Sequence, residues 1–494
     1  MQDIINFGFS VALQPINILF CFLGVLIGTL IGVLPGIGPA ATISLLLPST
    51  FHMSPVSAII MLAGIYYGAQ YGGSTTSILV NIPGEAASVV TCLDGYQMAS
   101  HGRAGLALAI SAFGSFIGGT LSVIGLMLLA PLLANFALRF GPPELFSLMF
   151  LGLVVLSYLS SGSVIKAMIM AAFGIFLGNI GVDIITGKPK FNLGIITLMD
   201  GIGLIPVVMG LFGIGEVLFN IEKSEGESEI FQKKISNFFP NLKDWMESIG
   251  AIIRGSVIGF FLGILPGGGA AVASFVSYAI EKKVSKHPEK FGEGAIAGVA
   301  GPETANNAAT GGAFIPLLTL GIPSNVVMAL LLGALLISGI QPGPLLIKEH
   351  PDLFWGVVVS MYLGNLMLLI LNLPLIPLWV QILKIPYWIL FPLILLFCVI
   401  GVYSLNNNVV EIFIMIFFGA LGYLMRKLDF EPAPLVLALV LSPMLENSLR
   451  SSLLMSQGSF LIFFSRPISS VLLLFAILLL TLSVIPRFRK PIRE

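Results

Sequence analysis

The sequence predicts an all-α polytopic membrane protein made of two inverted repeats, with re-entrant hairpins, broken helices and one further C-terminal helix. Of its 494 residues, 56% are hydrophobic and only 10% are charged, and the mean hydropathy is +1.01. Soluble domains carry roughly 25% charged residues, so this chain has too few to cover a globular surface. Many of its apolar runs reach the ~20 residues that a helix needs to cross a bilayer.

A spacing of glycine and proline that occurs twice indicates the repeat. Gly24, Gly28 and Gly32 precede Leu34-Pro35-Gly36, and Gly255, Gly259 and Gly263 precede Leu265-Pro266-Gly267, at a constant offset of 231 residues. Further on, Gly72-Gly73 pairs with Gly311-Gly312 and Pro83 with Pro323, at offsets of 239 and 240. An ordered series of matches of this kind is typical of two tandem copies of one unit.

The distribution of lysine and arginine predicts that the second copy is inverted. Residues 1–14 and 49–55, which flank the first Leu-Pro-Gly motif, hold neither lysine nor arginine, whereas the counterparts of these segments hold eight lysines between 223 and 290. Short cytoplasmic loops are enriched in these residues, so equivalent positions would lie on opposite sides of the membrane. We therefore expect a periplasmic N-terminus, a cytoplasmic C-terminus, and re-entrant hairpins with Pro35 and Pro266 at their tips.

This reading divides the chain into four parts: a first repeat (1–220), a cytoplasmic amphipathic linker (221–247), a second, inverted repeat (248–450) and a C-terminal helix with a basic cytoplasmic tail (451–494). Each repeat should contain a hairpin, a broken segment and further spans. The broken segments are expected at 56–98 and 292–347, and helices are expected near 104–134, 143–160, 163–180, 201–220, 353–379, 387–405, 409–425, 432–450 and 467–486.

Two polar passages interrupt the apolar spans at corresponding places, residues 64–85 and 301–325. Irregular backbone at membrane depth is tolerated only where protein buries it or a cavity adjoins it, and paired breaks are typical of a transporter's central site. A half-helix that starts after each Gly-Gly pair would direct its positive end at an anion. The substrate- and ion-binding candidates are Pro35, Gly36, Tyr67, Gly72, Gly73, Ser74, Thr75, Thr76, Asn81, Pro83, Glu85, Pro266, Gly267, Glu303, Asn306, Asn307, Thr310, Gly311, Gly312, Pro323, Ser324 and Asn325.

Other readings of these residues remain open. Oxygen atoms near Thr76 and Asn307 would suit a Na⁺ ion, whereas glycine, serine and threonine also serve simply to pack membrane helices closely. Glu85 and Asp94 are acids inside a predicted span, which makes them functional candidates. Glu85 follows Pro83-Gly84, however, and could equally begin a helix, where a carboxylate is favourable.

The motifs of several enzyme classes are absent from the sequence. It has no P-loop, nucleophile elbow or HExxH helix, and the glycines at 36–38 lack the strand that a dinucleotide loop requires. The three cysteines and four histidines are scattered, and the net charge of zero gives no indication of nucleic-acid binding. We expect neither enzymatic activity nor a cofactor other than a coupling ion, Na⁺ or H⁺.

The two polar passages, GIYYGAQYGGSTTSILVNIPGE and GPETANNAATGGAFIPLLTLGIPSN, together with the paired Leu-Pro-Gly tips, resemble the large permease subunit of the tripartite tricarboxylate transporters, the TctA family. The resemblance covers nearly the whole chain. It implies a secondary transporter of the bacterial inner membrane that takes up citrate-like carboxylates with a cation, with an elevator-type movement. It also implies two partners, a small membrane subunit of four helices and a periplasmic solute-binding protein.

The alternatives are a self-sufficient carrier or channel for another small solute and, in a different class, an intramembrane enzyme or assembly scaffold. Uptake by the purified chain alone would favour the first. Turnover of a substrate without any dependence on a gradient would favour the second.

Overall fold

The computed structural model describes residues 3–34, 38–159, 163–183, 186–192, 194, 196–223, 239–267, 269–382 and 387–484. The part before the linker holds α1 (Ser10–Ala12), α2 (Pro15–Val33), α3 (Gly38–Leu46), α4 (Pro55–Val80), α5 (Val89–Met98), α6 (Ala104–Ala137), α7 (Pro142–Leu159), α8 (Val164–Gly178), α9 (Leu204–Val208) and α10 (Gly215–Lys223).

The part after the linker holds α11 (Leu242–Ile264), α12 (Gly269–Val284), α13 (Ala297–Gly312), α14 (Phe314–Leu320), α15 (Val326–Ile337), α16 (Leu346–Glu349), α17 (Pro351–Asn372), α18 (Ile376–Ile382), α19 (Tyr387–Asn406), α20 (Val409–Lys427), α21 (Ala433–Met455), α22 (Ile462–Ser465) and α23 (Pro467–Val484). Short 3₁₀ or π turns lie at η1 (Ile4–Phe9), η2 (Leu47–His52), η3 (Ala86–Ser88), η4 (Ala99–Arg103), η5 (Ile196–Asp200), η6 (Met209–Ile214) and η7 (Pro288–Lys290).

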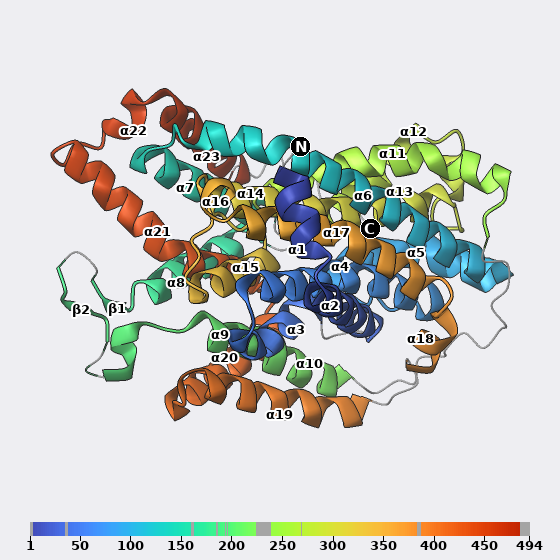
Figure 1. Cartoon of the computed structure of the whole chain (residues 1–494), viewed down its shortest axis with the longest axis horizontal. Helices are drawn as coiled ribbons and strands as arrows, with labels where there is room; N and C mark the ends of the chain where they lie inside the picture. Colours follow the sequence, from blue (N-terminus) through green and yellow to red (C-terminus); the bar gives the residue numbers. More distant parts are fainter. Residues whose placement is uncertain are drawn as a thin grey trace.

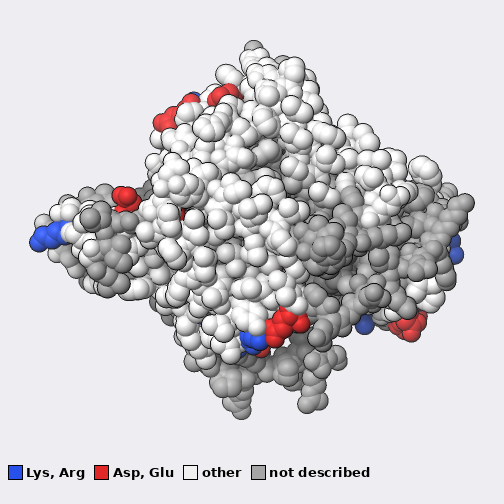
Figure 2. Space-filling model, turned by 90° about the horizontal axis from the view of Figure 1, so that it is seen from below, with Lys and Arg blue, Asp and Glu red and all other residues white. Residues whose placement is uncertain are grey.

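The expected class, an all-α polytopic membrane protein, is confirmed. Six helical stretches among the described residues are long and apolar enough to cross a membrane. The only strands in the described part form a two-stranded antiparallel ribbon, β1 (Gly181–Val182) with β2 (Pro189–Lys190), which the sequence did not predict. Figure 2 shows few charged side chains on a broad uncharged surface, as expected of a protein that faces lipid.

Helices α4 and α13 form the interior of the molecule. Every residue of α4 from Ser57 to Leu79 is buried, and so is every residue of α13 from Gly298 to Gly312. In Figure 1, α4 lies at the centre with α2, α15 and α17 around it, and these three helices all contact it. A helix buried on all sides needs no polar face, so its small residues serve close packing.

The spaced glycines allow two helix pairs to pack backbone against backbone. A Cβ atom on Gly24, Gly28 or Gly32 of α2 would lie 2.3–2.5 Å from a carbonyl oxygen of α4. The partner carbonyls belong to Met61, Ile65 and Ala69. In the other pair, a Cβ on Gly255, Gly259 or Gly263 of α11 would lie 2.1–2.5 Å from the carbonyl oxygens of Gly301, Ala305 and Ala309 in α13. The same packing therefore occurs in both halves.

This packing corrects the register of the glycine pairs. Gly72 lies against the carbonyl oxygen of Thr29, and Gly312 lies against that of Phe260, which follows Thr29 by the same 231 residues as the hairpin glycines. Gly72 thus corresponds to Gly312, at the offset of 240 that the prolines share, and not to Gly311 as the sequence match had it. Gly311 instead faces Ser122 of α6.

In the first half the helix break lies beyond the glycine pair, which corrects the prediction there. In the second half α13 ends at Gly312 and α14 begins at Phe314, so a helix starts after that pair as predicted, and a second break follows it. Helix α4 continues through Gly72, Gly73 and Thr76 and ends only at Asn81, which adopts a left-handed conformation with φ of 58°. Helix α14 likewise ends at Gly321, with φ of 70°. Glycines inside a tightly packed membrane helix are held by their neighbours, so the prolines a few residues later set the breaks.

The two breaks have the same backbone conformation. After the left-handed residue, each passes through a proline to an extended residue that precedes the next helical turn: Glu85 with φ/ψ of −151°/169° and Asn325 with −154°/176°. Asn81, Pro83 and Glu85 therefore correspond to Gly321, Pro323 and Asn325, each at the same offset of 240.

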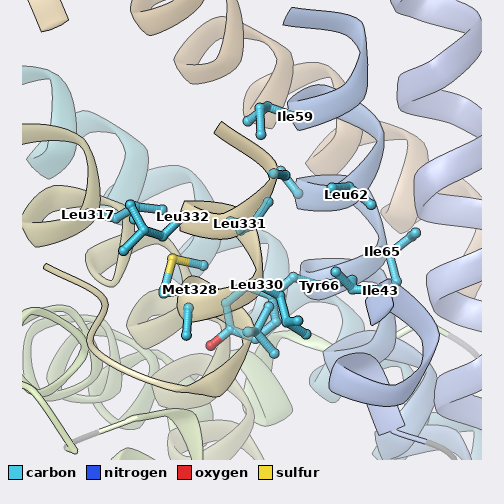
Figure 3. Packing of buried hydrophobic residues seen from close by; sticks show 14 of the residues in the cluster. Ile43, Ile59, Leu62, Ile65, Tyr66, Leu317, Met328, Leu330, Leu331 and Leu332 are labelled. Atoms are coloured by element: carbon cyan, nitrogen blue, oxygen red, sulfur yellow. The ribbon is translucent and has the colours of Figure 1, made fainter. Parts of the chain in front are cut away.

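The two halves interlock. Helix α6 packs against α13, where Gly114 and Gly118 approach Thr304, while α17 packs against α4, where Gly364 approaches Tyr67. At the periphery α8 packs against α21, and α20 packs against α9, η6 and α10. Figure 3 shows part of the apolar core, in which Leu330 and Leu331 of α15 lie beside Tyr66 of α4.

Much of the predicted amphipathic segment of the linker falls on residues 224–238, outside the described residues. Where the structure resumes, Asn241 accepts a hydrogen bond from the Asp244 amide at 3.0 Å and starts α11. The apolar residues Leu242 and Met246 belong to the first turns of this long helix, so the helix begins six residues before the boundary drawn at 248.

The close packing predicts which glycines cannot be changed. Gly259→Ala would place a methyl group against backbone of α13, and overpacking of this kind costs about 1–3 kcal/mol. Gly152→Ala in α7 is the matched control, because its Cβ would meet Pro266 at an ordinary 3.4 Å. We expect a lower thermal unfolding midpoint for purified Gly259→Ala and an unchanged or slightly higher one for Gly152→Ala. Equal midpoints would contradict this account of the packing.

Candidate functional site

A buried group of polar side chains joins α4, α5, α13 and the first break. We call it the central polar cluster; its members are Gln70, Ser74, Glu85, Thr91, Glu303, Asn306 and Asn307. All except Glu85 are at most 3% exposed. Both polar passages identified in the sequence contribute to it, so segments more than 200 residues apart meet here.

The carboxyl group of Glu303 lies at the centre of this cluster. Its oxygen Oε1 accepts a hydrogen bond from the Thr91 hydroxyl, and Oε2 accepts one from the Ser74 hydroxyl. The Asn306 amide also donates to Oε2, at 3.2 Å. No ion pair joins Glu303 to a lysine, arginine or histidine among the described residues. The carboxyl group is thus held by neutral donors from three helices.

The two adjacent asparagines find partners in the protein itself. Asn307 donates to the Ser115 hydroxyl of α6 at 2.8 Å and to Asn306 Oδ1 at 2.5 Å. Its own Oδ1 is buried without a hydrogen-bond partner. Because an unsatisfied buried acceptor is costly in hydrocarbon, this atom is available to a bound ligand or ion.

Glu85 and Gln70 extend the cluster toward the first break. The Gln70 amide donates to Glu85 Oε2 at 3.2 Å, while Gln70 Oε1 and Glu85 Oε1 are buried without partners. Glu85 also takes part in the turn that starts η3, since its amide donates to the Ser88 hydroxyl at 3.3 Å. Both readings of Glu85, as a start of a helix and as a polar group in the site, agree with the structure.

The second break reaches α4 through Tyr66. Asn325 donates to the Tyr66 hydroxyl at 3.1 Å and accepts from the Met328 amide at 3.0 Å, which caps α15. Figure 3 shows the Tyr66 ring between α4 and α15, near Met328. The positive end of α15 therefore lies beside α4, and the buried Ser324 hydroxyl next to it has no partner.

The order of these contacts gives the relative direction of the two passages. Along α4, Tyr66 contacts Asn325 and Ser74 contacts Glu303. In one direction along this contact, residue numbers therefore rise in the first passage and fall in the second. The corresponding segments lie side by side and run antiparallel.

The hairpins are anchored to the breaks. The Gly267 amide, at the tip between α11 and α12, donates to the Ser324 carbonyl at 2.8 Å, and next to it Pro266 packs against Gly152 of α7. In the first half, the Thr76 hydroxyl donates to the Val33 carbonyl at 2.6 Å, and Gly84 lies against the carbonyl oxygen of Gly32. Pro35 and Gly36 lie outside the described residues.

The remaining candidates are placed as follows. Thr310 is buried and donates to the Asn306 carbonyl at 2.9 Å, Tyr67 has a buried hydroxyl without a partner, Thr75 is buried, and Asn81 is exposed at the end of α4. No hydrogen bond links Thr76 to Asn307 in the described part.

Sequence reasoning missed Gln70, Thr91 and Ser115; an isolated glutamine within a buried span was the one available signal.

Asp94, the other acid predicted within a span, has a structural role. Its Oδ1 accepts from the amides of Gly292, Gly294 and Ala295 at 2.7–2.9 Å, and its Oδ2 accepts from the Tyr278 hydroxyl at 2.9 Å. The carboxylate thereby ties α5 to the loop that leads into α13. It is fully buried and is not hydrogen-bonded to the central polar cluster.

A cavity of about 670 Å³ lies apart from the central polar cluster and shares no residue with it. It is lined by helix ends and loops, among them Phe51, Asn406 and residues 199–206. At its rim Lys190 bonds Asp183 at 2.6 Å and Glu446 at 2.5 Å, and Arg450 bonds the same two acids. The hydrogen bond from Lys190 holds the pKa of the Asp183 carboxyl well below its usual value.

Comparison with known proteins gives consistent results. Residues 18–437 match the sequence model of the tripartite tricarboxylate transporter TctA family. An "uncharacterized 52.8 kDa protein in TAR-I ttuC' 3'region" of Agrobacterium vitis is 51% identical over 99% of this chain and 98% of its own length. An "uncharacterized protein in TAR-II ttuC' 3'region" of the same organism is 52% identical over 47% of this chain and 96% of its own length. No solved structure matches the chain.

The contacts of Asp94 predict a graded effect of substitution. Asp94→Ala would remove the acceptor of three amides in a loop that is partly open to solvent, and it would leave the Tyr278 hydroxyl without this partner. With about 1 kcal/mol lost for each hydrogen bond, it should lower the thermal unfolding midpoint. Asp94→Asn keeps one oxygen that can accept from all three amides, so its midpoint should stay close to that of the natural protein. Equal loss in both variants would show that the charge, and not the acceptor, is what matters.

Proposed function

The chain belongs to the TctA family of the tripartite tricarboxylate transporters, and we propose that it is the permease through which tricarboxylates or related organic carboxylate anions are taken up. As a member of this family it is a membrane transport protein and not an enzyme. In our proposal a cation gradient, of Na⁺ or H⁺, drives the uptake. A periplasmic binding protein delivers the anion, and a small four-helix membrane subunit completes the complex in the bacterial inner membrane.

The observation that carries the proposal is the meeting of the two polar passages. The antiparallel passages, the equal backbone conformation at Glu85 and Asn325, and the glycine packing of both hairpins support two inverted copies around one site. Transporters of this architecture bind their substrate at the interface of the copies, near the midplane. A site built from both halves changes its access when the halves move relative to each other, in an elevator-type or related movement.

The donors at the second break suit a carboxylate. The start of α15, the amide of Asn325 and the free hydroxyl of Ser324 lie together there, and a helix start favours anions. In this arrangement binding relies on neutral donors and the helix end, because no lysine or arginine contacts these residues in the described part. A neutral site releases an anion more readily than a strongly cationic one, which suits a carrier.

The cavity supports a direction for entry. The loops that line it, near Phe51, Asn179, Ile337, Asn406 and Asn447, are all on the periplasmic side in the topology predicted from the sequence. Their gathering around one cavity agrees with that topology. We place the entrance for the anion here, where the binding protein would deliver it.

An uptake assay tests the proposal. Proteoliposomes that hold the chain with its two partners should accumulate labelled citrate when an inward cation gradient is imposed, and should lose it when an ionophore collapses the gradient. Liposomes with the chain alone should take up much less. Full uptake by the chain alone would favour a self-sufficient carrier or channel, whereas turnover of the compound without a gradient would favour an enzyme.

One substitution tests the anion site. Asn325→Asp keeps the oxygen that caps α15, so the protein should remain as stable, but it puts a carboxylate where the anion binds. We expect uptake to fall roughly tenfold or more, since a charged partner is worth about 1.5–3 kcal/mol. Asn241→Asp makes the same change at the start of α11, at an exposed N-cap, and should leave uptake unchanged. Full uptake by Asn325→Asp would remove this residue from the site.

A further inference from the structure

Glu303 is a fully buried carboxyl group without a counter-charge. It is 0% exposed, and each of its hydrogen-bond donors among the described residues is a hydroxyl or an amide. A buried carboxylate that is not paired with a cation is costly, and such a group tends to become neutral by taking up a proton. Whether Glu303 is neutralised therefore depends on whether a proton or a metal ion binds to its carboxyl group in this site.

In the described residues, no lysine, arginine or histidine of the elements that pack against α13 is bonded to the central polar cluster. Arg254 of α11 is bonded through two nitrogens to Glu281 of α12, at 2.8 and 2.6 Å. Asp94 is bonded to the loop before α13, as described above. In the described residues, the titratable side chains that contact α13 or lie near Glu303 are Tyr66, Glu85, Cys92, Asp94 and Glu281. Tyr71 of α4 bonds Asn365 of α17 instead, and Tyr278 of α12 bonds Asp94.

The position of Ser74 allows both protonation states of Glu303. The Ser74 hydroxyl has two acceptors within reach, Glu303 Oε2 and, at 3.2 Å, the carbonyl oxygen of Gln70. When its hydrogen points to Glu303, the carboxylate is satisfied. When its hydrogen points to Gln70, the lone pair of Ser74 faces Oε2 and can accept a hydrogen bond from a protonated carboxyl group. The switch requires only rotation of one hydroxyl group.

Direct bonding within the cluster favours a proton over a metal ion. The hydroxyl oxygens of Ser74 and Thr91 are hydrogen-bonded to the carboxyl oxygens themselves, and Asn306 Oδ1 is taken up by Asn307. A Na⁺ ion would have to separate these atoms in order to reach the carboxylate. A proton binds without any change in their positions.

We propose that Glu303 binds the coupling proton, so that the permease is a proton symporter. The proposal rests on the transport function inferred above. In the outward-facing state the Glu303 carboxylate takes one proton from the periplasmic side and becomes neutral. In the inward-facing state the O–H bond breaks, the proton goes to the cytoplasmic side, and the carboxylate is restored. The neutral form also removes a negative charge that would repel the anionic substrate.

Infrared spectroscopy tests this without a substrate. pH-difference spectra of the purified full chain in lipid should contain a carboxylic-acid C=O band that Glu303→Gln removes and that the surface variant Glu289→Gln retains. Replacing choline chloride by NaCl at constant pH should leave the band in place. Loss of the band in NaCl would assign the site to Na⁺, and an unchanged spectrum in Glu303→Gln would show that Glu303 does not titrate; either result overturns the proposal.

A second variant keeps the test valid if Glu303→Gln does not fold. Thr91→Val removes one donor from Oε1 with little change in shape, so it should shift the pH at which the same band appears. The conservative Thr319→Val, at a buried threonine that bonds only within α14 at 2.7 Å, should leave that pH unchanged. An unshifted band in Thr91→Val would overturn the assignment of the band to Glu303.

Transport with the complete complex tests the coupling. With labelled citrate as the probe, an inward proton gradient without Na⁺ should drive accumulation, and Glu303→Gln should reduce it to the level of empty liposomes. Accumulation driven by a Na⁺ gradient at equal pH, and not by protons, would overturn the proton proposal but leave the transport function standing. Absence of uptake under both gradients would contradict the transport function, and the infrared result would then decide the protonation of Glu303 alone.

Discussion

The structure depends on the antiparallel contact between the two polar passages, because α4 and α13 are buried on every side and their polar groups must find partners within the protein. The bond between the Ser74 hydroxyl and the Glu303 carboxyl is one of several that join the two halves, together with those of Thr91 to Glu303 and Asn325 to Tyr66. Hydrocarbon offers no substitute partner for such groups, so their bonds fix how the helices align. The hairpins, the breaks and the interlocked outer helices are all arranged around this pair of helices.

Close approach of the backbones makes the contact possible. Glycines at four-residue spacing bring α2 onto α4 and α11 onto α13, and in both pairs carbonyl oxygens occupy the space that side chains would fill. The inner helices thereby lie close enough for short side chains such as Ser74 and Thr91 to reach across. Since small residues reduce side-chain entropy costs as well as distance, they suit an interface without a hydrophobic driving force.

The breaks and the central polar cluster contribute different chemical groups to the proposed site. The prolines at 83 and 323 end the long helices and give α15 a free start, where Asn325 and Ser324 present donors. The acids lie deeper, between helices, where neutral donors surround them. The anion binding and cation coupling that we propose would therefore use different groups in adjacent places, so a relative movement of the two halves would act on both together.

The sequence by itself determined the membrane class, the helices, the family and the two passages that meet, because hydropathy, glycine spacing and proline positions act locally along the chain. It misplaced the first break at Gly72-Gly73 and the register of Gly72 by one residue, since packing keeps glycines such as Gly73 helical. Only the tertiary structure shows that the Asp94 carboxylate binds the loop before α13 and that the Thr76 hydroxyl binds the end of α2. Only the tertiary structure shows that Thr91 and Ser74 bond Glu303. Hydrogen bonds between residues that are distant in the sequence produce no periodic pattern along the chain, so they can be identified only in the folded structure.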